Sequence, residues 1–334
     1  MKISASIYSD KKRPLKEVIE DLVAHNVNLL HVDCNDDLSV FNDIEAIRRW
    51  CDLPIDLHII TEKPELYYDK LREVPVEYLT FQYEQLPQDF NLPLDIKGEK
   101  GLAITTPTSI EVFKDFEDFD FLLVMATIPG QSGGVFDPIN FQKIRNFKKL
   151  YPRKAIHVDG GVNAEVSFIL RNLGVRSSVS GSYLFKSASV GEALMNLTNR
   201  EHVSSFCVKD FMEMLHDDIF VYIEGLNLEK ILTAIEVGNK GLAIVKNIEG
   251  LFMGIITNAD VRRFLLANIT DIYSADVTEM INKTPVVIEE TATVEEMLNH
   301  VKAQAFPISY LPAVSQENKA VGMITFVNLI KGEL

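Results

Sequence analysis

The chain has 334 residues, 47% hydrophobic and 24% charged, which is an ordinary globular balance and enough length for two domains. Its formal net charge of −15, without a basic cluster, argues against nucleic-acid binding. The three cysteines, Cys34, Cys51 and Cys207, form no zinc-binding spacing and predict reduced thiols. Apolar runs fall short of the ~20 residues of a membrane span, and the first ten residues lack a signal-peptide core. We therefore expect a cytoplasmic protein without membrane contact.

The first half of the chain alternates short apolar runs with helical patterns. The runs expected to be strands are Ile3–Ile7, Leu29–Asp33, Ile55–Ile59, Tyr78–Gln82, Leu102–Thr105, Phe121–Ala126, Ala155–Asp159 and Ser177–Gly181. Helical patterns lie between most of them, at Leu15–His25, Ile44–Trp50, Pro64–Arg72 and Asn140–Leu150. Eight βα units in about 190 residues favour an α/β fold, a (β/α)8 TIM barrel over residues 1–200. An open doubly wound sheet is the alternative, but the glycine-rich dinucleotide turn is missing after the first strand.

Three of the expected strands end in histidine and aspartate. His31 and Asp33 lie two apart and share one face of the second strand, while His58 ends the third strand and Asp159 the seventh. In a barrel these ends meet at the mouth. A lone strand-end histidine is usually structural, and an aspartate there is often only a helix cap. We also expect His25 and His157 to be structural. Two imidazoles and two carboxylates together predict a site for zinc, iron, manganese or cobalt.

The first 185 residues or so resemble the ribulose-phosphate 3-epimerase family. The matching segments are Ser4–Ile7, Leu30–Asp33, Asp56–His58, Leu123–Met125, Pro129–Gly130, Val158–Gly161 and Ser180–Ser182. The resemblance implies that His31, Asp33, His58 and Asp159 bind the metal. It also implies that Asp33 and Asp159 are the acid and base that invert the carbon next to the ketone of a ketose phosphate. The metal would stabilise the enediolate as a Lewis acid.

Glycine-bearing loops follow the sixth, seventh and eighth strands, where barrels commonly bind phosphate through backbone N–H groups. By resemblance, Ser6 would form a hydrogen bond near the metal, and Met125 remains from the family's sulfur-rich floor. The residues expected to bind substrate are Ser6, Met125, Gly130, Gly133, Gly160, Gly161, Gly181 and Ser182.

The sequence departs from the family at the residues that face the substrate. Cys34–Asp37 stands where the family usually has a hydrophobic residue followed by Met-Asp-Gly, and Ile60 stands where it has methionine. Gln82 replaces the histidine that usually ends strand four. Thr105–Pro107 replaces Asn-Pro-Gly, and Gln131–Gly134 replaces Phe-Gly-Gly-Gln. The four expected metal ligands are kept while the residues expected to face the substrate differ. The identity of the ketose phosphate is therefore open. The rival interpretation is a non-catalytic sensor or scaffold that binds a sugar phosphate and a nucleotide. The related decarboxylases are disfavoured because no lysine stands between Asp33 and Asp36.

The second half contains an internal repeat with an offset of 68 residues. Gly-x-x-Thr-x-x-Asp at Gly254–Asp260 recurs with asparagine at Gly322–Asn328, each after a strand-like run. Such a repeat predicts two similar modules packed face to face. It resembles a tandem CBS pair within residues 201–334, with repeats at about 210–270 and 275–334. The resemblance implies an adenine nucleotide bound by Thr257 and Asp260 and, in the second repeat, by Thr325 and Asn328. Dimerisation without nucleotide is the alternative, and both halves resemble families that form homo-oligomers.

Overall fold

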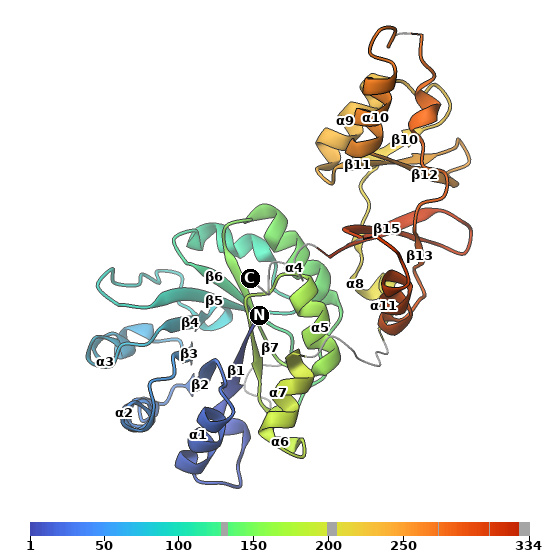
Figure 1. Ribbon diagram of the computed structural model, residues 1–334. Coiled ribbons are helices and arrows are strands. Elements are labelled where there is room, and N and C mark those ends of the chain that lie inside the picture. Colours follow the sequence, from blue (N-terminus) through green and yellow to red (C-terminus); the bar gives the residue numbers. More distant parts are fainter. Residues whose placement is uncertain (128–132, 199–205, 273, 307, 327–334) are drawn as a thin grey trace. The chain divides into compact units, whose positions relative to one another are not determined.

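The computed structural model describes residues 1–127, 133–198, 206–272, 274–306 and 308–326. The chain divides into two compact units between residues 202 and 203. This division falls within residues 199–205, outside those described, so the expected boundary at residue 200 stays a prediction. In Figure 1 the first unit runs from blue to green and the second from yellow to red. No described helix has the length and apolar character needed to cross a membrane.

The first unit is a closed barrel of eight parallel strands in sequence order, as predicted. The strands are β1 (Lys2–Ser6), β2 (Leu29–Asn35), β3 (Ile55–Ile60), β4 (Tyr78–Gln82), β5 (Glu99–Thr105), β6 (Phe121–Met125), β7 (Ala155–Asp159) and β8 (Ser177–Ser180). The register pairs β8 with β1 and so closes the ring. The open doubly wound sheet is therefore ruled out.

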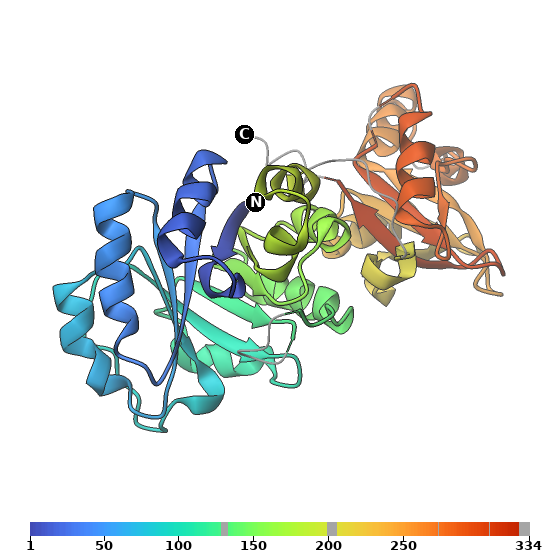
Figure 2. The same ribbon diagram turned by 90° about the horizontal axis from the view of Figure 1, so that it is seen from below.

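Helices lie outside the barrel strands, as Figures 1 and 2 show. They are α1 (Leu15–Ala24), α2 (Val40–Trp50), α3 (Tyr68–Glu73), α4 (Ile139–Leu150), α5 (Ala164–Asn172), α6 (Ser182–Lys186) and α7 (Val190–Thr198), with 3-10 segments η1 (Ile7–Ser9) and η2 (Pro64–Tyr67). The strands β4 and β5 are followed only by the 3-10 segments η3 (Tyr83–Gln85) and η4 (Ile110–Phe116) within the fully described residues 78–120. The expectation of eight βα units is wrong at these two places. After β4, Pro87 and Pro93 remove backbone donors that a helix would need.

The side chains inside the barrel include an apolar cluster, with the buried His157 stacked against it, and a polar layer toward the carboxyl ends of the strands. The apolar cluster comprises Leu29, Tyr78, Ala103, Phe121, Leu123 and Met125. The strand ends above it carry the polar residues, because alternate side chains of a strand share one face. The register aligns Asp33 with His58 across β2 and β3, and Met125 with Asp159 across β6 and β7. The polar layer is therefore at the carboxyl ends of the strands, the mouth of the barrel.

The second unit contains two modules that share the predicted repeat. The sheet of the first module has the order β10 (Phe220–Tyr222), β11 (Leu242–Lys246), β12 (Phe252–Thr257). The second has the order β13 (Ile288–Glu289), β14 (Tyr310–Val314), β15 (Ala320–Thr325), β9 (Glu213–Met214). The helical segments are α8 (Val208–Phe211), α9 (Leu228–Gly238), α10 (Asn258–Ala267), α11 (Val294–Lys302), η5 (Asp217–Ile219) and η6 (Val277–Met280).

The two hairpins of the repeat have the same register. Leu242 pairs with Thr257 in the first module, and Tyr310 pairs with Thr325 in the second, so the 68-residue offset holds in three dimensions. Each hairpin also carries a bulge near its far end. The strand β9 precedes the first module in sequence but pairs with β15 of the second. A reciprocal backbone bridge joins Asn282, which precedes the second module's sheet, to β12.

Candidate active site

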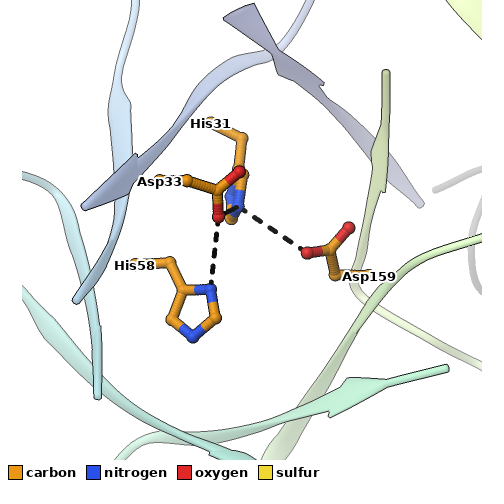
Figure 3. Close-up of side chains that lie close together, drawn as sticks. All are labelled: His31, Asp33, His58 and Asp159. Carbon is orange, nitrogen blue, oxygen red and sulfur yellow. Dashed lines mark hydrogen bonds and ion pairs between the residues drawn. The ribbon is translucent and has the colours of Figure 1, made fainter. Parts of the chain in front are cut away.

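His31, Asp33, His58 and Asp159 meet at the barrel mouth. One potential ligand atom from each lies within 4.8 Å of the other three. His31 Nε2 is 3.2 Å from Asp33 Oδ1 and 3.8 Å from Asp159 Oδ2, and His58 Nδ1 is 3.4 Å from Asp33 Oδ1. Figure 3 shows His31, Asp33 and His58 together on the left, with Asp159 facing them from the right. These residues come from β2, β3 and β7, as the sequence predicts.

The far nitrogen of each imidazole faces a hydrogen-bond acceptor. His31 Nδ1 lies 3.0 Å from Asp56 Oδ2, which also accepts a hydrogen bond of 2.8 Å from the Ser4 hydroxyl. His58 Nε2 lies 2.9 Å from Gln82 Oε1. When the far nitrogen donates its hydrogen, the near nitrogen keeps a lone pair that can bind a metal.

The four side chains His31, Asp33, His58 and Asp159 fit a divalent transition metal as its ligands. His58 Nδ1 is buried and makes no hydrogen bond, and Figure 3 shows it facing the Asp33 carboxylate, whose Oδ1 is 3.4 Å away. A buried polar atom without a partner is costly, and a metal ion would satisfy it. Two imidazole nitrogens and two carboxylates are ligands that zinc, iron, manganese and cobalt accept.

Burial and neighbouring charges act against each other on the pKa values of this group. Burial lowers the pKa of His31, but the carboxylates of Asp33 and Asp56 raise it by more, so the net shift is upward. Burial raises the pKa of Asp33, but His31 and His58 lower it by more, so the net shift is downward. Burial raises the pKa of Asp159 to about 6, and the charge of Asp33 adds to this rise while His31 opposes it. The two aspartates thus differ in proton affinity in the metal-free protein.

The loops after β6, β7 and β8 contact one another beside this group. A Cβ atom added to Gly161 would lie 2.2 Å from the backbone nitrogen of Phe136, in the loop after β6. A Cβ atom on Gly133 of that loop would lie 4.0 Å from Ser182 Oγ, at the start of α6 just after β8. The structure therefore brings together three glycine-bearing loops that we expect to bind phosphate.

The remaining predicted substrate residues lie at the same end of the barrel. Met125 is buried beside Asp159 in the strand register. The Ser6 hydroxyl accepts a hydrogen bond of 3.1 Å from Ser9. The chain packs tightly at Gly160 and Gly181, where an added Cβ atom would lie 2.2 Å from Thr127 Oγ1 and 2.1 Å from Ser9 Oγ, respectively. Gly130 lies outside the described residues.

The sequence interpretation missed the roles of Asp56, Gln82 and Lys186. Asp56 stands two residues before His58, so the period of a strand already placed it on the inner face. Gln82 was noted only as a departure from the family. A Cβ atom on Gly133 would lie 3.5 Å from Lys186 Nζ, which places a cation beside the phosphate loops. No sequence signal marked this lysine, because it follows the recognised Gly-Ser motif.

In the second unit, the predicted nucleotide residues form a helix cap. Asp260 accepts hydrogen bonds from the backbone nitrogen and the hydroxyl of Thr257 at the start of α10. The other oxygen of Asp260 pairs with Arg263. Thr325 ends β15 at the equivalent place, and Asn328 lies outside the described residues. The nucleotide site stays a prediction.

Comparison with known proteins agrees with both parts of the chain. The model of the ribulose-phosphate 3-epimerase family matches residues 2–185, and the model of the CBS domain matches residues 277–333. Proteins named ribulose-phosphate 3-epimerase are similar to this chain. The Methanocaldococcus jannaschii protein is 30% identical over 227 residues, 64% of this chain and 95% of the relative. The Bacillus subtilis protein is 27% identical over 212 residues, 59% of this chain and 98% of the relative.

Solved structures similar to this chain include two of CBS proteins. CBSX2 from Arabidopsis thaliana has 17% identity and a TM-score of 0.32, covering 39% of this chain and 95% of that one. CBSX2 in complex with AMP has 18% identity and a TM-score of 0.32, covering 39% and 96%. The match of the family model to more than half of the residues, on a closed (β/α)8-type barrel, decides the assignment. The chain belongs to the ribulose-phosphate 3-epimerase family of carbohydrate isomerases and carries a CBS domain that follows the barrel in the sequence.

Proposed function

We propose that the barrel is a metal-dependent epimerase that inverts the carbon next to the ketone of a ketose phosphate. The observation that carries this proposal is the four-residue donor cluster, whose ligand atoms lie within 4.8 Å of one another. His31, Asp33, His58 and Asp159 would hold the ion. When bound, a divalent ion supplies Lewis-acid stabilisation of the negative charge that develops on the substrate oxygens.

The two aspartates would move the protons. Epimerisation removes a proton from one face of the carbon and returns a proton to the other face. Asp33 extends from β2 and Asp159 from β7, so their carboxylates approach the group from different sides (Figure 3). One carboxylate would remove the C3 proton from one face. The other aspartate, as a carboxylic acid, would then give its own proton to the opposite face of C3. The roles exchange in the reverse direction.

The loops after β6, β7 and β8 would bind the phosphate. The backbone N–H groups of Gly133, Gly160, Gly161 and Gly181 and the hydroxyl of Ser182 are the expected donors, with the Lys186 ammonium group nearby. Ribulose 5-phosphate and xylulose 5-phosphate are the first substrates to test. The departures from the family at Cys34–Asp37 and Thr105–Pro107 are the reason to test hexulose phosphates beside them.

Deuterium exchange tests the proposed reaction. Protein loaded with zinc, manganese or cobalt is incubated in deuterated water with each ketose phosphate, and C3 is followed by NMR. We expect deuterium at C3 together with the second epimer. A protein that binds a sugar phosphate but exchanges no C3 proton with any of these sugars would instead be a sensor.

The variants Asp33→Asn and Asp159→Asn test the two proton carriers. Each should lower kcat by about 10²–10⁴-fold, because general acid–base catalysis contributes that much. The aspartate that remains should still exchange the C3 proton of one epimer without producing the other. Metal content is measured for each variant, since loss of the ion would also stop turnover. Asp43→Asn in α2 is the matched control, because Asp43 only accepts a hydrogen bond from Tyr8.

We further propose that the second unit binds an adenine nucleotide at Thr257 and Asp260 and so regulates the barrel. The support is the recurrence of the Thr-x-x-Asp motif as Thr-x-x-Asn, each at the end of a hairpin of identical register, together with the CBS family match. Thr325 and Asn328 would form the equivalent site of the second repeat.

A further inference from the structure

Gln82 and Glu84 form a chain of hydrogen bonds that ends at His58. Gln82 Oε1 lies 2.9 Å from His58 Nε2. The Gln82 amide nitrogen donates to one oxygen of Glu84. The Gln82 side chain is almost fully buried, with 2% of its surface exposed, so its orientation depends on these two partners.

Glu84 itself is held by the end of β5. Its second oxygen accepts hydrogen bonds of 2.8 Å from the backbone nitrogen and the hydroxyl of Thr105, and another from the Thr108 hydroxyl. Burial raises the pKa of Glu84, but these donors and Gln82 lower it by more, so the net shift is downward. Glu84 is therefore a charged group that can only accept hydrogen bonds.

This arrangement fixes the direction of every hydrogen bond in the chain. Because the Glu84 carboxylate only accepts, Gln82 must turn its NH₂ group toward Glu84 and its oxygen toward His58. The oxygen of Gln82 only accepts, so His58 must carry its hydrogen on Nε2. The lone pair of His58 is then on Nδ1, the atom that is buried without a hydrogen-bond partner in the donor cluster.

We infer that Glu84, acting through Gln82, is a positioning residue that sets the tautomer of His58 and so prepares its Nδ1 to bind the metal. This inference rests on the proposed metal site, and it concerns residues that touch neither metal nor substrate.

An exchange of the two side chains tests the inference. In Glu84→Gln the Thr105 and Thr108 donors should still bond to the side-chain oxygen of residue 84. The NH₂ group of the new glutamine must then face Gln82. Gln82 must then turn over and present NH₂ to His58, which moves the imidazole hydrogen to Nδ1. Metal affinity should fall by about 10–100-fold, the usual effect of losing such an outer partner. In the double variant Gln82→Glu/Glu84→Gln the donor and acceptor order is restored, and most of the lost affinity should return.

The first measurement is cobalt affinity, read from the visible absorption of the bound ion. Glu77→Gln is the matched control, because Glu77 accepts hydrogen bonds from the Ile55 backbone and Arg48 before β4, away from the mouth. It should bind cobalt as the native protein does. Glu84→Gln with native affinity, or a double variant that binds no more tightly than Glu84→Gln, would overturn the inference.

The second measurement needs no metal. Nitrogen NMR of metal-free protein with labelled histidine shows which ring nitrogen of His58 carries hydrogen, and His58→Gln assigns the signal among the seven histidines. We expect Nε2–H in the native and double variants and Nδ1–H in Glu84→Gln. If native His58 carries hydrogen on Nε2 but the protein does not bind cobalt, the proposed metal site is contradicted and the inference about Glu84 is not. Hydrogen on Nδ1 in the native protein would contradict the inference.

Discussion

Gly161 illustrates how single residues shape the loops that we propose bind phosphate. Its backbone has a φ of 67°, a left-handed conformation that side chains disfavour. A Cβ atom there would lie 2.2 Å from the backbone nitrogen of Phe136, and backbone cannot rotate away as a side chain can. The residue therefore keeps the loops after β6 and β7 in close contact.

Substitution of Gly161 should affect both stability and substrate binding. We expect Gly161→Ala to lower the free energy of unfolding by about 1–3 kcal/mol from backbone strain. The displaced loops should also raise the KM for the ketose phosphate more than they lower kcat. Gly174→Ala is the control, since Gly174 has a similar φ of 73° but lies before β8 at the other end of the barrel. Equal KM changes in both variants would show that the Gly161 contact does not shape the phosphate site.

At the scale of elements, α4 supports the end of β5. Lys143 of α4 donates hydrogen bonds of 2.6–2.8 Å to the backbone carbonyls of Thr105, Thr106 and Thr108. The same turn supplies the donors that hold Glu84. A helix on the outside of the barrel thus stabilises a turn on which the orientation of Gln82 depends.

Removing the Lys143 ammonium group should weaken metal binding from a distance. Lys143→Met should lower Tm, because hydrogen bonds to a charged group contribute about 1.5–3 kcal/mol. It should also lower cobalt affinity, because the turn that holds Glu84 loosens. Lys154→Met is the control, since Lys154 donates to the carbonyls of Glu117 and Phe119 before β6. That variant should lose stability and keep its cobalt affinity. Unchanged cobalt affinity in Lys143→Met would show that α4 does not support metal binding through this turn.

The strands were predictable from sequence, but the links between them were not. Alternating apolar runs located all eight barrel strands, and the two-residue period placed His31 and Asp33 on one face. Eight regular βα units would need α-helices after β4 and β5, but the chain forms the 3-10 segments η3 and η4 there, within the fully described residues 83–120. The contacts of Glu84 with Thr105 depend on the pairing of β4 with β5, and side-chain pattern alone gives no such register.

At the scale of the whole molecule, the two units should respond to different ligands. The proposed metal ligands all belong to the barrel, and Thr257 and Asp260 belong to the second unit. A ligand that binds only the folded form raises the stability of the unit that contains its site, by about 2.7 kcal/mol at a hundredfold excess over Kd.

Scanning calorimetry should therefore separate the two units. We expect cobalt to raise the melting temperature of one transition and AMP that of another. Asp260→Ala should abolish the effect of AMP. Glu296→Ala is the control, because Glu296 caps α11 through Thr293 as Asp260 caps α10, without belonging to the proposed site. If AMP and the related ligands ATP and S-adenosylmethionine shift no transition, the CBS pair serves assembly instead.

The pairing of β9 with β15 has a consequence for synthesis on the ribosome. Every strand of the barrel precedes residue 181, so the barrel can close while the rest of the chain is still being made. The strand β9 emerges next, yet its partner β15 is translated only after both modules' other strands. Until β15 has been made, the backbone N–H and C=O groups of β9 on that edge are unpaired and can bond to strands of other chains. Nascent chains stalled before residue 320 should therefore recruit chaperones through the second unit rather than through the barrel.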